Sequence, residues 1–186
     1  RRVAVLHPNL IEAAKAVPRN RHIRRCLGVD WGGGGESMIS YTTVAVVGLC
    51  PDGRVEVIFG WRCPNLHDHD LEVRTILHLF VLFGCNFLAH DFNGIGDIQE
   101  TMLHKAGLPA ELIHPVSYIA HANGAMMIEV PENEETHQRW HYRLVKSRSL
   151  TFLAALIRRQ RVLFFADDYK NQDNRGLLRD FTTLVQ

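Results

Sequence analysis

Two aspartates each follow a short apolar run and precede glycines. Asp30 ends "CLGVD" and is followed by "WGGGG", whereas Asp91 ends "FLAHD" and is followed by "FNGIG". In an open α/β sheet, ligands bind beyond the carboxyl ends of the strands, so the two carboxylates converge if their strands are neighbours. Close carboxylates repel each other unless a cation lies between them, and Mg²⁺ prefers such oxygen ligands. The pattern therefore predicts a divalent metal site at Asp30 and Asp91, with a turn or helix cap as the alternative for either aspartate alone.

The glycines after both aspartates favour a ligand that approaches the backbone closely. A backbone without side chains leaves room for a bulky polymer beside the metal. The segment "DFNGIGD" also opens a predicted helix, whose free N–H groups could face a phosphate. No GxxxxGK[ST] motif occurs in the sequence, which excludes a Walker-type ATP site.

The composition is that of one globular domain of 186 residues, but its charge is segregated. The net charge is +1, yet Arg1–Arg25 carries seven basic residues and one acid, and Arg139–Arg161 carries seven and none. This segregation suggests a polyanionic partner, although basic faces on exposed helices are a common alternative. No apolar run is long enough to span a bilayer, and no secretory signal opens the chain. The first residue is Arg1 and not Met, so we expect a fragment of a longer protein.

The predicted elements follow the order β-β-β-α-β-α-β, then an inserted hairpin and further helices. A turn at "PDGR" predicts that the second and third strands pair in a hairpin. Pro115 predicts an edge strand or a bend. "LHDHD" is interpreted as a helix start capped by Asp70 rather than as a zinc site, and the four cysteines, which have no CxxC spacing, are predicted to be reduced and buried. The predicted strands are Arg25–Asp30, Tyr41–Cys50, Val55–Arg62, Asn86–His90 and Leu112–Ile119, with a hairpin of Ala125–Val130 and His141–Val145, and the predicted helices are Asp70–Leu82, Ile98–Ala106, Leu150–Arg161 and Gly176–Gln186.

Three segments resemble the nuclease domain of the large terminase subunit of tailed bacteriophages. They are "LGVDWGGGGES…YTTVAVVG", "FLAHDFNGIGD" and "KSRSLTFLAALIRRQRVLFFADD", and the most specific piece is D-x-N-G-x-G from Asp91 to Gly96. The resemblance implies an α/β, RNase H-like fold. Its mixed β-sheet would combine a three-strand antiparallel meander with parallel strands, and helices would cover both faces. Residues 1–24 are then an N-terminal lead-in or linker, and residues 25–186 are the nuclease domain, whose C-terminal part is expected to be incomplete.

The activity implied by this resemblance is metal-dependent endonucleolytic cleavage of double-stranded DNA during viral genome packaging. By position, Asp30 and Asp91 are similar to the first two metal-binding acids of the family. Two Mg²⁺ or Mn²⁺ ions about 3.5–4 Å apart would flank the scissile phosphate, with Asp30 bridging both and Asp91 holding one. The chain departs from the family pattern in its third acid, which we expect beyond Gln186. The weaker candidates within the chain are Glu36, Asp97 and Asp167, the last paired with Asp168.

DNA contact is predicted for five basic residues near the third segment. Phosphate contacts supply sequence-independent binding, and a solvated helix face is the alternative for the last three residues. The candidates are Lys146, Arg148, Arg158, Arg159 and Arg161. The resemblance also implies an ATPase domain in the same full-length chain, the portal protein and the small terminase subunit as partners, no membrane, and the cytoplasm of an infected bacterium as the location.

Two alternatives remain open from the sequence. The first is another RNase H-like nuclease, such as a Holliday-junction resolvase or a transposase core, which would prefer branched DNA or use a different third acid. The second is a catalytically silent relative that binds only DNA or the portal protein.

Overall fold

A mixed eight-stranded sheet forms the centre of the computed structural model, which describes residues 12, 14–32, 34–35, 38–39, 41–63, 68–132 and 139–164. The strand order is β10-β5-β4-β1-β6-β7-β9-β8. The strands are β1 (Arg24–Asp30), β4 (Thr43–Leu49), β5 (Val55–Arg62), β6 (Phe87–Asp91), β7 (Ile113–Ile119), β8 (Met127–Pro131), β9 (Trp140–Val145) and β10 (Val162–Phe164), with a separate ribbon of β2 (Gly34–Gly35) and β3 (Met38–Ile39). The helices are η1 (Arg19–Arg21), α2 (His69–Leu82), α3 (Gly96–Lys105), η2 (Ala110–Leu112) and α4 (Lys146–Arg158).

The predicted antiparallel meander and the parallel strands beside it are confirmed. β1 pairs antiparallel with β4, and β4 pairs antiparallel with β5 across the turn that follows Pro51. β6 lies parallel to β1 on its other side, and β7 lies parallel to β6. The predicted hairpin is also present, since β8 and β9 pair antiparallel, and β9 joins the main sheet parallel to β7.

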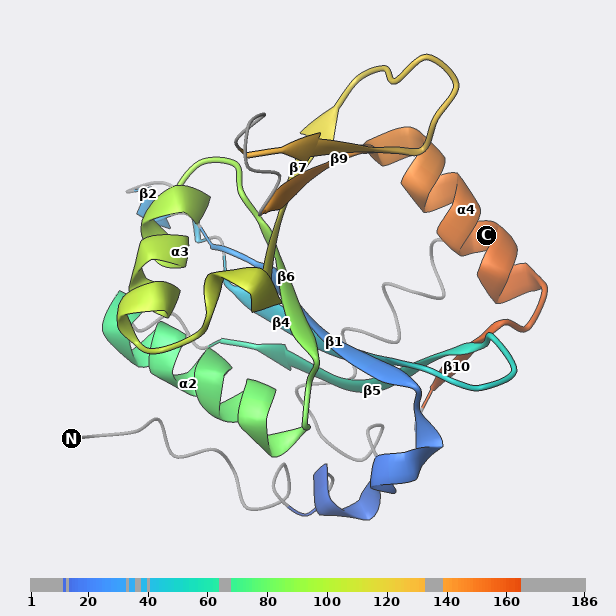
Figure 1. Ribbon diagram of the computed structural model, residues 1–186, viewed down its shortest axis with the longest axis horizontal. Helices are drawn as coiled ribbons and strands as arrows, with labels where there is room; N and C mark the ends of the chain where they lie inside the picture. The colour runs from blue at the N-terminus through green and yellow to red at the C-terminus, as the bar shows by residue number, and fades with distance from the viewer. Residues whose placement is uncertain are drawn as a thin grey trace.

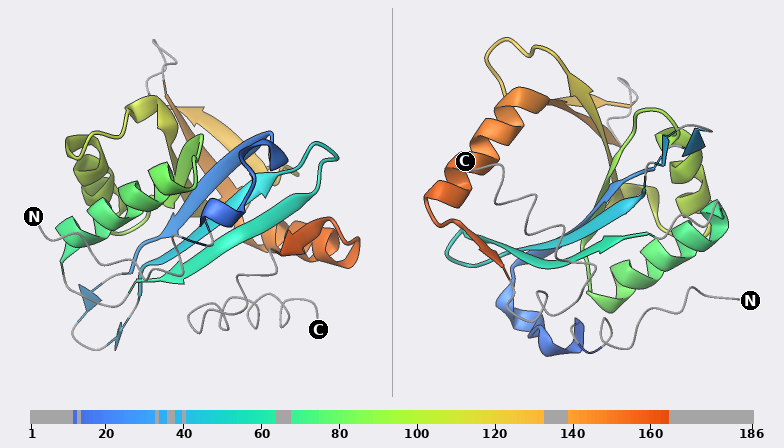
Figure 2. Two further views of the ribbon diagram at one scale, coloured as in Figure 1. Left: turned by 90° about the horizontal axis from the view of Figure 1, so that it is seen from below. Right: turned by 180° about the vertical axis from the view of Figure 1, so that it is seen from behind.

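Only one face of this sheet carries the main core. Along β1 the burial alternates, with Leu27 and Val29 buried and Cys26 and Gly28 half-buried. The buried residues pack with α2 and α3, which lie together on one side of the sheet (Figure 1). α4 lies on the opposite side, and the view from behind shows the same division (Figure 2). No residue of α4 is buried, so the second face is flanked by a helix but not closed by it within the described ranges.

Of the two predictions made for Pro115, an edge strand is wrong, and a bend stays a prediction. β7 lies between β6 and β9, so Pro115 is in an interior strand. The missing N–H of Pro115 is tolerated because the ladder between β7 and β9 begins only at the next residue, Val116. The carbonyl of Val116 faces β6 instead, where it accepts from the backbone N–H of Phe92.

Two helix starts differ from the predicted ones. Asp68, and not Asp70, caps α2, because its side chain accepts from the backbone N–H of Leu71 at 3.0 Å. α4 begins at Lys146, four residues before the predicted start at Leu150. The prediction missed this first turn because its Ser and Arg residues show no apolar periodicity.

The lead-in before β1 packs against the same core. Ala14 and Val17 belong to the buried apolar cluster that includes the residues of β1. The four cysteines are free, as predicted, and Cys50, Cys63 and Cys85 are buried, whereas Cys26 is only half-buried. None of the helices in the described ranges is long and apolar enough to cross a bilayer. The predicted helix Gly176–Gln186 lies outside the described residues.

Candidate metal and nucleic-acid site

The structure brings Asp30 and Asp91 to adjacent positions at the carboxyl edge of the sheet. β1 and β6 are parallel neighbours in which Val29 lies opposite His90, so the next residue of each strand is an aspartate. By alternation, both aspartates lie on the face opposite α2 and α3. Burial and then the negative charge of Asp91 raise the pKa of the Asp30 carboxyl above its ordinary value. The convergence expected from the sequence is therefore present, and it carries the electrostatic cost of two like charges.

A tight turn after β6 fixes the carboxylate of Asp91. Its Oδ1 accepts from the backbone N–H of Asn93 at 2.9 Å and from the Asn93 side-chain amide at 2.8 Å. Gly94 has a positive φ of 66°, which favours glycine. A Cβ on Gly96 would lie 2.4 Å from the carbonyl oxygen of Asp91, so this glycine allows the start of α3 to touch the strand end. Both glycines thus shape the turn that holds Asp91, and clearance for DNA stays a prediction.

A buried hydrogen-bonded chain joins the two strand ends behind the carboxylates. Trp31 directly follows Asp30, and His90 directly precedes Asp91. The indole N–H of Trp31 donates to Nδ1 of His90 at 3.1 Å. Nε2 of His90 lies 2.8 Å from Oε2 of Glu100 on α3. His90 Nδ1 also lies 3.1 Å from the backbone carbonyl oxygen of Asp91, so both ring nitrogens have polar partners. The residues that neighbour the acids therefore tie β1, β6 and α3 together.

Arg139 completes this chain at the carboxylate of Glu100. The two side chains form a buried ion pair, and Arg139 also reaches Glu132 at 3.3 Å. Burial alone would raise the pKa of Glu100, but hydrogen bonds from His90 and Arg139 outweigh it and hold the pKa below its ordinary value. Trp31, His90, Glu100 and Arg139 were not identified from the sequence, because their contacts depend on which strands are neighbours. The only local signal was a tryptophan and a histidine beside the two aspartates.

A lysine and a tyrosine lie on the same side as the acid pair. Nζ of Lys146, the first residue of α4, is 5.3 Å from the centroid of the Tyr118 ring, near the end of β7. Burial and then the charges of Asp91 and Asp30 raise the pKa of Tyr118, which places its hydroxyl within their field. Lys146 in turn lowers the pKa of Asp30, against burial and Asp91. Of the five predicted DNA contacts, Lys146 is the one that the structure brings to the acids.

The other four predicted DNA contacts are placed differently. Arg148 donates to the carbonyl of Gly124, in the loop before β8, and Arg161 donates to the carbonyl of Asp52 at 2.9 Å, in the β4–β5 turn. Arg158 ends α4 and Arg159 is its C-terminal cap, both of them exposed. Two of the four arginines thus hold loops, and two present charge to solvent.

The third acid is not supplied by the part of the chain that the structure describes. Asp97 is exposed in the first turn of α3, and the charges that act on the pKa of Asp30 are those of Asp91 and Lys146. The side chain of Glu36, together with Asp167 and Asp168, lies outside the described residues. The acid pair offers hard oxygen ligands on one side of a sheet edge, which fits a divalent cation of the Mg²⁺ or Mn²⁺ type.

A second cluster of metal-binding residue types lies near the opposite end of β1. Ligand atoms of His22, Cys50 and Glu56 lie within 4.8 Å of one another, and all three residues are buried. However, both Glu56 oxygens already accept from Arg21, at 2.6 and 2.7 Å, and His22 Nε2 lies 2.6 Å from Oε2. The guanidinium of Arg21, which is paired with this carboxylate, opposes a divalent cation, so the cluster is better explained as an ion-pair network.

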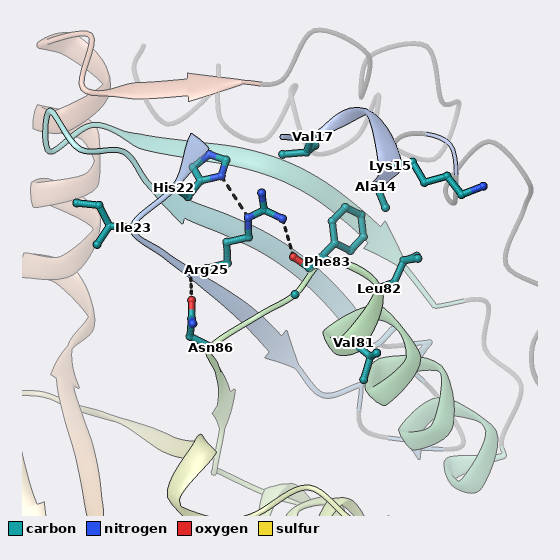
Figure 3. Close-up of a pocket in the computed structure, with 11 residues that line it drawn as sticks. Ala14, Lys15, Val17, His22, Ile23, Arg25, Val81, Leu82, Phe83 and Asn86 are labelled. Carbon is teal, nitrogen blue, oxygen red and sulfur yellow. Dashed lines mark hydrogen bonds between the residues drawn. The ribbon is translucent and has the colours of Figure 1, made fainter. Parts of the chain in front are cut away.

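Figure 3 shows how Arg25 extends that network beside a cavity of about 660 Å³. Its guanidinium donates to His22 Nδ1 at 3.2 Å, to the carbonyl of Phe83 at 2.7 Å and to the carbonyl of Pro18 at 2.8 Å. The guanidinium of Arg25 is thus occupied in joining the lead-in, β1 and the end of α2.

Comparison with protein-family models finds none that matches this sequence, and comparison with curated proteins finds no significant match.

Proposed function

We propose that this protein is a metal-dependent endonuclease that hydrolyses phosphodiester bonds of double-stranded DNA. In this proposal the domain has the RNase H-like fold and acts in viral genome packaging, as the nuclease domain of a large terminase subunit. The sheet is compatible with that fold, because a three-strand meander is followed by parallel strands.

The observation that carries the proposal is the convergence of Asp30 and Asp91. Two carboxylates lie at adjacent parallel strand ends, and among the described residues none forms an ion pair with Asp30. Such a site favours the binding of a cation, because without one the like charges repel each other and destabilise the fold. Asp91 is held in one orientation by Asn93, which is the pre-organisation that a metal ligand needs.

The residues of the chain would divide the work of hydrolysis. Divalent ions, when bound, would activate a water for attack on phosphorus and stabilise the leaving 3′ oxygen. Asp30 and Asp91 would hold the ions, and the Trp31–His90–Glu100 chain would keep the two strand ends at a fixed separation. Lys146 and the exposed Arg158 and Arg159 would contact phosphates, which predicts binding that weakens steeply with salt.

Replacement of the acids tests the proposal directly. With Mn²⁺ and supercoiled plasmid, we expect Asp30→Asn and Asp91→Asn to lower the cleavage rate at least about a hundredfold, because each removes a ligand that is needed in the transition state. Asp70→Asn, at an exposed position in the first turn of α2, is the matched control and should cleave as the parent does. Full activity of Asp30→Asn would refute the assignment.

Two further outcomes separate the proposal from its alternatives. Preferential cleavage of four-way junctions over linear duplex would favour a resolvase. A silent DNA-binding relative is the second candidate, because the described part of the chain brings together only two carboxylates. That candidate gains support if the parent binds duplex DNA but cleaves none at any Mn²⁺ concentration.

A further inference from the structure

Lys146 lies at the end of β9, on the face of the sheet that carries Asp30 and Asp91. β9 lies parallel to β7 with Tyr118 opposite Leu144, and Lys146 follows β9 by one residue. β7 in turn lies beside β6, where Val116 is opposite Asp91. Asp91, Val116, Tyr118 and Leu144 therefore share one face of the sheet, and the lysine extends from the end of that row.

The ammonium group lies over Tyr118, on the face of the sheet that carries the acids, but it is not paired with either acid. Its Nζ lies over the ring of Tyr118, at 5.3 Å from the centroid. Within the described ranges, Lys146 makes no ion pair within 4 Å of a carboxylate, whereas Arg21 and Arg139 do. A lysine stem has four rotatable carbons, so the charge can move several ångströms without a change in the backbone.

We propose that Lys146 is a built-in counter-ion of the acid pair that competes with the divalent cation and contacts the scissile phosphate once the cation is bound. This inference rests on the proposed nuclease function. In the metal-free protein, the ammonium offsets the repulsion between Asp30 and Asp91. When a divalent cation takes over that neutralisation, the same ammonium is repelled from the carboxylates and is free to pair with a non-bridging phosphate oxygen.

Competition predicts that metal affinity and cleavage change in opposite directions. Lys146→Met keeps the length of the side chain but removes the charge, so the full chain without DNA should bind Mn²⁺ about fivefold more tightly. The same variant should cleave plasmid about a hundredfold more slowly at saturating Mn²⁺, because a charge that faces the phosphate in the transition state is lost. Damage to the fold would weaken metal binding, so tighter binding cannot arise from misfolding.

The measurement is Mn²⁺ titration followed by electron paramagnetic resonance, paired with plasmid cleavage. Lys146→Arg keeps the charge and should bind Mn²⁺ as the parent does. Lys105→Met, at an exposed position near the end of α3, is the matched control and should change neither property. Unchanged or weaker Mn²⁺ binding by Lys146→Met would overturn the inference.

Failure of this inference is distinguishable from failure of the proposed function. If Asp30→Asn loses both Mn²⁺ binding and cleavage while Lys146→Met behaves like Lys105→Met, only the role of Lys146 is wrong. If Asp30→Asn keeps both properties, the nuclease assignment itself is wrong.

Discussion

The central strand β1 begins at a cluster of opposite charges and ends at a pair of like charges. Near the first residue of β1, the side chain of Glu56 from β5 is 1% exposed, and its oxygens accept from the guanidinium of Arg21 and the imidazole of His22. At its end, Asp30 and Asp91 lie side by side, and the pKa of Asp30 is raised by burial and by its neighbour. At one end of the strand the charges are paired directly, whereas at the other end no described residue forms an ion pair within 4 Å of Asp30 or Asp91.

This difference separates a structural cluster from a candidate site. A buried ion pair holds the chain together because the loss of one partner leaves the other uncompensated. Repulsive carboxylates do not stabilise the fold, so their placement on adjacent strands favours a role in binding a cation. By residue type alone the His22–Cys50–Glu56 cluster resembles a metal site more closely, but its charge balance indicates that it is not one.

Loss of Glu56 should be the largest stability change at either end of the strand. We expect Glu56→Ala to lower the free energy of unfolding by about 3 kcal/mol, because the buried His22 loses its acceptor and Arg21 loses its two hydrogen bonds to Glu56. Urea denaturation followed by circular dichroism measures this change. The matched control is Glu12→Ala, which removes an exposed ion pair with Lys15 and should change little. Equal effects of the two substitutions would mean that the cluster is not structural.

A methyl group on Gly48 should test how tightly the same cluster is packed. A Cβ there would lie 2.3–2.7 Å from three atoms of the His22 ring, so the imidazole must leave its place beside Glu56. We expect Gly48→Ala to destabilise the protein by about 2 kcal/mol, although alanine is normally better than glycine in a strand.

Gly28 provides the comparison for Gly48 within the same sheet. A Cβ on Gly28 would lie 3.8 Å from its nearest neighbour, the carbonyl oxygen of Ala45, which is ordinary contact. Gly28→Ala should therefore leave the urea midpoint unchanged or raise it slightly. A stable Gly48→Ala would show that the His22 ring can move at little cost.

The sequence was sufficient to predict the order of strands along the chain and the position of the two aspartates. Alternation along β1, the turn after Pro51 and the apolar run before Asp91 are local signals, and each is confirmed. The bounds of α4 were less predictable, because its first turn is polar. Pro115 was misleading, since its effect depends on where the ladder with β9 begins.

Long-range contacts explain most of what the sequence could not predict at the candidate site. The hydrogen bond from Trp31 to His90 joins residues 59 positions apart, and it requires that β1 and β6 be neighbours. The place of Lys146 depends on β9 joining the sheet beside β7, whereas a hairpin signal indicates only that two strands pair with each other. Sequence patterns predicted the two aspartates as candidate ligands, but the residues that surround them became visible only in three dimensions.

Loss of the charge on Asp30 should have the smallest effect on stability and the opposite sign. We expect Asp30→Asn to raise the free energy of unfolding at neutral pH by about 0.5 kcal/mol, a figure kept small because Asp30 is more than one-third exposed and solvent screens its repulsion from Asp91. Because the folded-state pKa of Asp30 is raised, the parent loses stability as the pH rises through that pKa. The advantage of the variant should therefore be full at neutral pH and disappear below the ordinary carboxyl pKa. The His22 end behaves in the opposite way. Burial lowers the pKa of the His22 imidazole, so the stability that the neutral ring contributes is lost as the pH falls through that pKa. Urea denaturation of parent and variant across this pH range measures both trends. An Asp30→Asn variant that is less stable at neutral pH would show that the two carboxylates are already neutralised within the folded chain.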